Sequence, residues 1–285
     1  MKYFISIYII TFCLSVSATM IPKNDLNIPT SYKGLTDIDE VKFNEILDSL
    51  EGAYRPLIES QGNTFTVERD WEDGTVNAKA WKKGDNFFFK MYGGLARYET
   101  MTPDSYLLVG CHEVGHLIGG APTIKPFNIS SSEGQADYFS TLKCFRKVVR
   151  GQDHSKIIAE KPIHPLALSE CGLSFEINSE SYEICLRTNL ANMAMARTFH
   201  KLRDLELLPA FDTPDPYVRM FIIFNGYPNS QCRMDTLFAG SLCNVSEEDN
   251  VDMNLYNKGV CSTIKNDKRG VRPLCWYVPR EEDKQ

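Results

Sequence analysis

Cysteine usage most constrains the fold of this chain. Its 285 residues include nine cysteines, and all except Cys13 lie at or beyond position 111. Setting Cys13 aside leaves an even set: Cys111, Cys144, Cys171, Cys185, Cys232, Cys243, Cys261 and Cys275. In an exported chain such a set indicates disulfide bonds, although the sequence does not choose among the pairings. We therefore expect a disulfide-rich C-terminal region over about residues 232–285.

The N-terminus supports export. Lys2 precedes an apolar run from Tyr3 to Leu14, and Val16-Ser17-Ala18 supplies the small residues that signal peptidase prefers. This run is too short for a comfortable membrane span, and no later apolar stretch reaches membrane length. We predict a signal peptide over residues 1–18 and a mature protein that is periplasmic or secreted, without stable membrane insertion.

Composition favours one globular domain over residues 19–285. Hydrophobic residues make up 43% of the chain and charged residues 24%, which is close to the average of soluble proteins. The formal net charge of −6 argues against a nucleic-acid binder with a basic face. Oligomeric state stays open.

Periodicity predicts an α+β order of elements. Apolar residues recur at helical spacing over about residues 37–58, and β-rich segments follow. We expect the latter to form a small antiparallel sheet: Thr64–Arg69, Val76–Trp81 and Asn86–Arg97. Three helices are predicted after the sheet: from Thr102-Pro103 to Gly119, from Ser132-Glu133 to Gly151, and from Tyr182 to about Leu208.

The strongest motif is His112-Glu113-Val114-Gly115-His116, inside the first of these helices. Histidines at i and i+4 project from one helical face, where they can bind one zinc ion. Glu113 lies beside them, within reach of a water molecule at the metal. The alternative is a pair of histidines that merely pack against neighbouring elements.

The next predicted helix offers a third ligand. Glu133 and Asp137 are four residues apart, and the loop after His116 is long enough to fold this helix back onto the first. Glu133 would then face the metal, and Asp137 would accept the free ring N–H of His112. The alternative is two solvated carboxylates near a helix N-terminus, stabilised by the helix dipole.

Together these motifs resemble the gluzincin metallopeptidases, in particular the family of HtpX-type and CAAX prenyl proteases. That family carries a downstream His-Pro with an arginine five residues after the proline, and here Pro228 and Arg233 keep this spacing. Tyr227 replaces the histidine. The resemblance, over about residues 86–236, implies that Tyr227 helps to stabilise the transition state and that Arg233 braces the site. Alternatively, Tyr227 lies at a core edge and Arg233 at the surface.

The resemblance also implies a zincin-like fold in which a strand beside the metal binds substrate. Gly93, Gly94 and Leu95 lie just ahead of the histidine helix, and glycines let a second backbone approach closely. An ordinary β-bulge is the alternative for this segment.

The sequence thus predicts a zinc metalloendopeptidase that acts on proteins or peptides, with one catalytic Zn²⁺. His112, His116 and Glu133 would bind the metal, and Glu113 would act as general base. One alternative is a zinc-binding pseudo-peptidase or chaperone-like protein that captures extended segments. Another is a metal-free domain held by its disulfides.

Overall fold

The computed structural model describes residues 20–32, 36–127 and 129–279. The predicted signal peptide lies outside these residues and stays a prediction. None of the helices in the described part of the chain combines the length and the hydropathy that a membrane span needs.

Helix α1 (Glu40–Glu59) opens the first half of the structure, close to the predicted helix. Asp39 caps it by accepting a hydrogen bond from the backbone N–H of Lys42 at 2.8 Å. The apolar stripe that predicted the helix is buried: Phe43, Ile46, Leu47, Leu50, Tyr54 and Ile58. This stripe packs α1 against β1 and the central helix α3.

The sheet contains β1 (Thr64–Asp70), β2 (Ala78–Lys83) and β3 (Asn86–Tyr92), in the order β1-β3-β2. The expected antiparallel sheet is wrong, because β3 pairs antiparallel with β2 but parallel with β1. A tight hairpin at Gly84-Asp85 returns β3 beside β2, and β3 fills the space left between β1 and β2. A hairpin signal in the sequence predicts the pairing of the two adjacent strands, here β2 and β3. It does not predict how a more distant strand, here β1, pairs with them.

The third strand is shorter than predicted. It ends at Tyr92, and Gly93–Ala96 forms the short helix α2 instead of extending the strand. A Cβ atom on Gly93 would lie 1.9 Å from the Trp71 carbonyl oxygen, and one on Gly94 would lie 1.9 Å from that of Gly74. The glycines therefore let α2 pack against the loop before β2.

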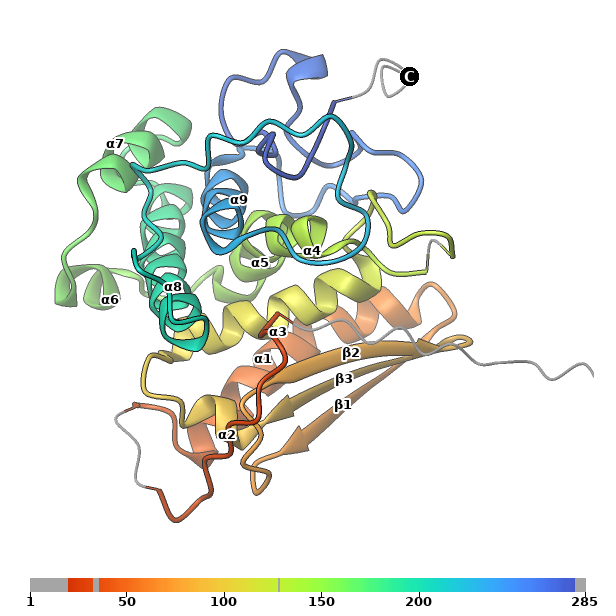
Figure 1. The fold of residues 1–285 in the computed structure, drawn as a ribbon, viewed down its shortest axis with the longest axis vertical. Coiled ribbons are helices and arrows are strands. Elements are labelled where there is room, and N and C mark those ends of the chain that lie inside the picture. Colours follow the sequence, from red (N-terminus) through yellow and green to blue (C-terminus); the bar gives the residue numbers. More distant parts are fainter. Residues whose placement is uncertain (1–19, 33–35, 128, 280–285) are drawn as a thin grey trace, which may run out of the picture.

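Helix α3 (Pro103–Ile118) crosses the middle of the molecule (Figure 1). Thr102 and Ser105 form a reciprocal capping box, Pro103 occupies the first turn, and Gly120 follows the helix end with φ +85°. A Cβ on Gly110 would meet Leu50 of α1 at 2.9 Å and Phe89 of β3 at 3.3 Å, so α3 lies tightly between the sheet and α1.

Helices form most of the other side of α3 (Figure 1). Helix α4 (Glu133–Phe139) continues through a π-helical turn, η1 (Ser140–Cys144), into α5 (Phe145–Val149). These three consecutive elements lie where a single helix was predicted. Four further helices follow: α6 (Ser155–Glu160), α7 (Pro165–Ser174), α8 (Glu180–Leu202) and α9 (Ser230–Leu242). Helix α8 ends before the predicted Leu208, and Asp204 just beyond it is left-handed with φ +46°.

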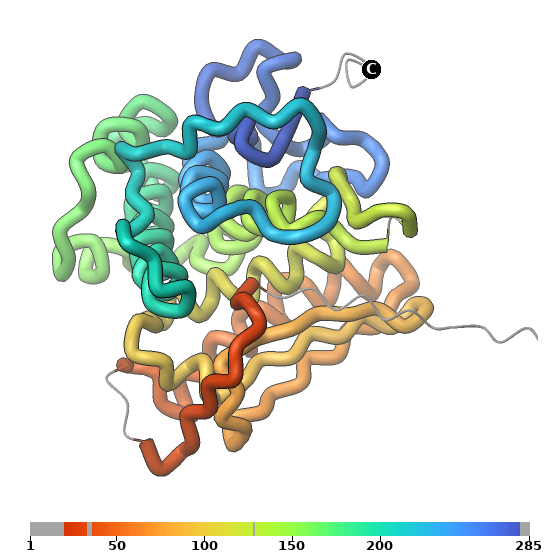
Figure 2. The backbone as a smooth tube through the Cα atoms, in the orientation of Figure 1, coloured from red at the N-terminus to blue at the C-terminus, as the bar shows by residue number. Residues whose placement is uncertain are grey.

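The described part of the long C-terminal tail, up to residue 279, has one short 3₁₀ helix, η2 (Thr263–Lys265). Figure 2 shows this tail in blue, lying over α4 and α9 at the top of the view. The eight cysteines pair as expected, in four disulfides: Cys111–Cys144, Cys171–Cys185, Cys232–Cys275 and Cys243–Cys261. Two of these bonds join the tail to α9 or its end.

Candidate metal centre

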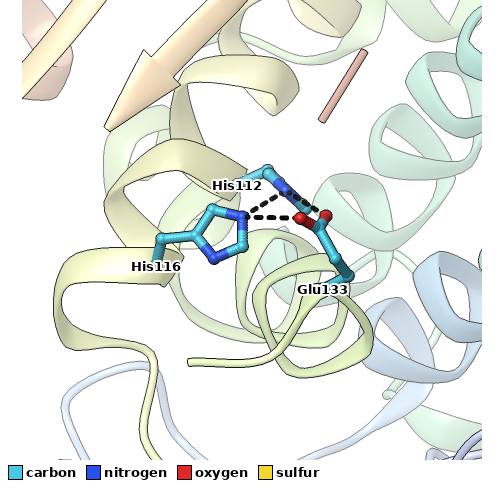
Figure 3. A group of neighbouring side chains, drawn as sticks. All are labelled: His112, His116 and Glu133. Carbon is cyan, nitrogen blue, oxygen red and sulfur yellow. Dashed lines mark hydrogen bonds and ion pairs between the residues drawn. The ribbon is translucent and has the colours of Figure 1, made fainter. Parts of the chain in front are cut away.

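Three of the predicted ligands converge in the interior. His112 and His116 extend from α3 and Glu133 from the start of α4, and all three are buried (Figure 3). The Nε2 atoms of the two histidines are 2.9 Å apart. Glu133 Oε2 lies 3.3 Å from Nε2 of His112, and Oε1 lies 3.6 Å from Nε2 of His116. Ligand atoms of this group all fall within 4.8 Å of one another, a spacing suited to one metal ion.

A glycine lets the two helices approach closely enough to form this group. A Cβ on Gly115, in the turn between the histidines, would lie 3.0 Å from the Cα of Ala136 in α4. Any larger residue at position 115 would push α4 away from α3. Gly115 therefore sets the spacing that brings Glu133 to the histidine face.

The outer nitrogen of each imidazole faces an acceptor. His116 Nδ1 lies 2.9 Å from the Ser131 carbonyl oxygen, and His112 Nδ1 lies 2.8 Å from Asp137 Oδ1. A carbonyl oxygen and an ionised carboxylate accept hydrogen bonds but cannot donate them. Both Nδ1 atoms are therefore assigned a proton, which leaves a lone pair on each Nε2 when the ring is neutral.

Two nitrogen lone pairs and a carboxylate thus point at one another. Such a group needs a cation between its members, either a proton or a metal. Burial by itself would lower the pKa of His112, but the carboxylates of Asp137 and Glu133 outweigh it and raise that pKa to about 9. For Glu133, burial opposes ionisation, yet the two histidines hold its pKa well below the usual range. The centre is built to hold positive charge.

Asp137 and Arg233 form the layer behind His112. Arg233, on α9, donates from Nε and Nη2 to the two carboxylate oxygens of Asp137 at 2.7 and 2.8 Å. Both side chains are completely buried. Burial would raise the pKa of Asp137, but Arg233 and His112 lower it, so the carboxylate stays charged and orients the imidazole. Arg233 braces this layer and is not at the surface.

Glu113 lies next to the ligand group and is also fully buried. Its Oε1 accepts a hydrogen bond from the backbone N–H of Met20 at 2.8 Å. Its Oε2 has no hydrogen-bond partner among the described residues. Burial raises the pKa of this carboxyl, although the two histidines partly offset the effect. Glu113 is thus a carboxylate with one oxygen free to take part in chemistry.

The other predicted site residues have different surroundings. Tyr227 is 40% exposed, and the centroid of its ring is 5.6 Å from the guanidinium carbon of Arg233. It therefore borders the layer behind the ligands. Gly93, Gly94 and Leu95 are buried in α2 against the loop before β2. They form a buried helix and not the expected exposed strand edge, and their role in binding substrate stays a prediction. The edge strand that faces α3 is β2.

Sequence reasoning missed the contribution of the C-terminal tail. A Cβ on Gly134, next to Glu133, would lie 2.4 Å from the ring of Trp276, which is fully buried. Arg272 donates to the side-chain oxygen of Gln135 at 3.0 Å and to the Ala121 carbonyl at 3.1 Å. The tail thus fixes the first turn of α4, which carries Glu133. No local pattern links Trp276 to Gly134.

A second group of potential ligands contains Asp215, Cys232 and Cys275. The two cysteines form a disulfide, so their sulfur atoms are not thiolate ligands. Among the described residues, the histidine–glutamate group is therefore the stronger candidate for a metal.

Comparisons with known proteins do not identify a relative of this chain. No family model, curated protein or solved structure matches the chain.

Proposed function

We propose that this protein is a zinc-dependent metallopeptidase that hydrolyses peptide bonds. The observation that carries the proposal is the convergence of two histidine lone pairs and one carboxylate beside Glu113, which has an unpartnered oxygen. A catalytic zinc site typically has three protein ligands and one open position. His112, His116 and Glu133 fit that donor set, and Asp137 supports it from behind.

The motif order also supports a place among the gluzincin peptidases. The resemblance to HtpX-type and CAAX prenyl proteases rests on His112, His116 and Glu133, followed by Asp137 and Arg233. The contact between Asp137 and Arg233 agrees with the bracing role that the resemblance implies. A zincin-like fold is part of this proposal, with α3 and α4 as its two ligand-bearing helices.

When bound, zinc supplies a Lewis acid that lowers the pKa of water towards about 7. Glu113 then acts as general base. It takes a proton from the attacking water and gives it to the nitrogen that leaves the cleaved peptide bond. Its raised pKa suits a group that must both accept and return a proton. Tyr227, at the border of the site, would stabilise the negative charge that develops on the attacked carbonyl, while Arg233 braces Asp137 and donates from Nη1 to a backbone carbonyl.

Export is part of the same proposal. Disulfides persist in oxidising compartments, and this chain forms four. Together with the predicted signal peptide, they favour a periplasmic or secreted peptidase that acts on proteins or peptides.

The test compares wild type with Glu113→Gln on a degenerate peptide library, with cleavage detected by mass spectrometry. Glutamine keeps the shape of Glu113 but cannot accept the proton, so cleavage should fall about 10³-fold. Zinc content, measured by elemental mass spectrometry, should remain stoichiometric in both proteins. Glu160→Gln, on the exposed end of α6, is the matched control and should cleave at the wild-type rate.

Equal cleavage by wild type and Glu113→Gln would overturn the mechanism. Zinc binding with capture of extended peptides, but no cleavage by either protein, would favour the pseudo-peptidase alternative. A folded protein that binds no zinc at all would favour a domain held by disulfides alone.

A further inference from the structure

The N-terminal residues of the described chain lie against the metal centre. We call residues 20–28 the strap; it starts beside the middle of α3 and descends past the sheet, in red in Figures 1 and 2. The backbone N–H of Met20 donates to Glu113 Oε1 at 2.8 Å, and the Met20 carbonyl accepts from Arg233 Nη1 at 2.6 Å. The side chains of Met20 and Ile21 are fully buried.

The direction of the strap is that of a bound peptide. In peptide hydrolysis, the nitrogen that leaves must lie beside the group that gives it a proton. Here that group is Glu113, and the nitrogen beside it belongs to Met20. The next backbone group, the Met20 carbonyl, meets the cation of Arg233. Met20 therefore occupies the place of the residue whose nitrogen hydrolysis would release.

Beyond Ile21 the strap is held by a few polar contacts. Asn24 donates to the carbonyls of Pro22 at 2.9 Å and Val76 at 3.1 Å. Its side-chain oxygen accepts from the Leu26 N–H at 3.0 Å. Farther along, Ile28 N–H donates to the Gly74 carbonyl at 2.7 Å.

This part of the strap borders solvent. Lys23, Asp25 and Leu26 are exposed, and Asn27 forms an isolated antiparallel bridge with Thr75 instead of joining the sheet. A segment with exposed backbone bonds and few buried contacts opens at lower free energy than the core. Residues 23–27 are therefore the part of the strap that opens first, whereas Met20 and Ile21 are packed in the main core and must be displaced from it.

We propose that the strap is a built-in inhibitor that occupies the substrate position and must be displaced before the centre can act. The proposal rests on the proposed peptidase function for its consequence, but not for its geometry. It also defines the ligand: an extended peptide with an apolar residue such as methionine at the Met20 position and a second apolar residue after it.

The test loosens the strap away from the metal centre. Asn24→Ala removes the contacts to Pro22, Val76 and Leu26, and Asp25→Ala, at an exposed neighbour, is the matched control. Both proteins are loaded with zinc, and zinc loss to an excess of chromogenic chelator is timed. If the strap occupies the centre most of the time, Asn24→Ala should lose zinc at least about tenfold faster than wild type and Asp25→Ala.

Two further readouts use the same proteins. An acetylated fluorescent peptide with the sequence of residues 20–27 should bind Asn24→Ala about tenfold more tightly than wild type, because the competing strap is weakened. Peptide-library cleavage should rise by a similar factor. Met20→Asp should increase zinc loss and peptide binding further, and Met20→Leu is its control. Circular dichroism shows whether each variant folds.

The outcomes separate the two proposals. Faster zinc loss and tighter peptide binding without cleavage by any variant would support the strap and overturn the peptidase. Cleavage by wild type, with zinc loss and peptide binding unchanged in folded Asn24→Ala, would support the peptidase and overturn the strap. A lower melting temperature of Asn24→Ala with no change in these readouts would make the strap a structural strut.

Discussion

The two halves of the molecule are stabilised in different ways. In the sheet half, residues 36–101, Arg97 is the only polar or charged side chain that is buried among the described residues. In the helical half, residues 103–279, buried side chains include the three candidate metal ligands, the pair of Asp137 with Arg233, and all four disulfides. The sheet half has an apolar core, whereas the helical half contains the candidate metal ligands.

The difference follows from what each half must hold. Alternating strands and an amphipathic helix bury apolar surface without further support. The helical half contains short helices such as α4 and a long irregular tail, and it also keeps several charges away from water. Covalent links and paired charges offset that cost. Most buried polar groups therefore lie in the half that contains the candidate metal centre.

The largest expected effect comes from removing a buried arginine in each half. Arg233→Met leaves the buried carboxylate of Asp137 without its partner and should lower the free energy of unfolding by about 4 kcal/mol. Arg97→Met removes hydrogen bonds to the neutral carbonyls of Ile28 and Trp71 and should cost about 2 kcal/mol. Urea denaturation of both variants measures the two losses in the free energy of unfolding. Equal losses would mean that breaking the buried charge pair costs no more than losing hydrogen bonds to carbonyl oxygens.

A smaller effect is expected from one disulfide of the helical half. The Cys232–Cys275 bond spans 43 residues and ties the tail to α9, next to Arg233. Replacing both cysteines with alanine should cost about 3 kcal/mol. Hydrogen exchange should accelerate in α9 and in residues 270–279 but not in β3. Equal acceleration in β3 would show that the two halves open as one unit.

The smallest effect concerns a lysine in the sheet half. Burial lowers the pKa of Lys82, in β2, to about 8. Below pH 8 the folded protein keeps this partly buried charge, so Lys82→Met should be more stable than wild type by about 1.5 kcal/mol at pH 7. Between pH 8 and the pKa of an exposed lysine, about 10.4, the folded state gives up its proton first. Wild type therefore gains stability over that pH range, and the difference in stability between Lys82→Met and wild type disappears.

Thermal unfolding at pH 7 and pH 10 measures this dependence. Lys83→Met, at the exposed end of the same strand, is the control for adding an apolar side chain. A gap between wild type and Lys82→Met that is the same at both pH values would contradict the assignment.

Local patterns predicted much of the secondary structure and the ligand set. Capping residues fixed the start of α3, and helical periodicity placed His112 and His116 on one face. The spacing of Glu133 and Asp137 predicted their approach to the histidines, which the structure shows. The missed features all depend on contacts between distant segments: the parallel pair of β1 and β3, the helix at Gly93, and the tail residue Trp276 against Gly134.

The sequence by itself determined which residues share a helix face and that the eight later cysteines form disulfides, because helix geometry and an even cysteine count are local or compositional properties. Only the tertiary structure decided which cysteines pair, how β3 enters the sheet, and that Met20 reaches Glu113 across 93 positions of the chain. Those outcomes depend on how whole faces pack, and no short segment encodes that packing.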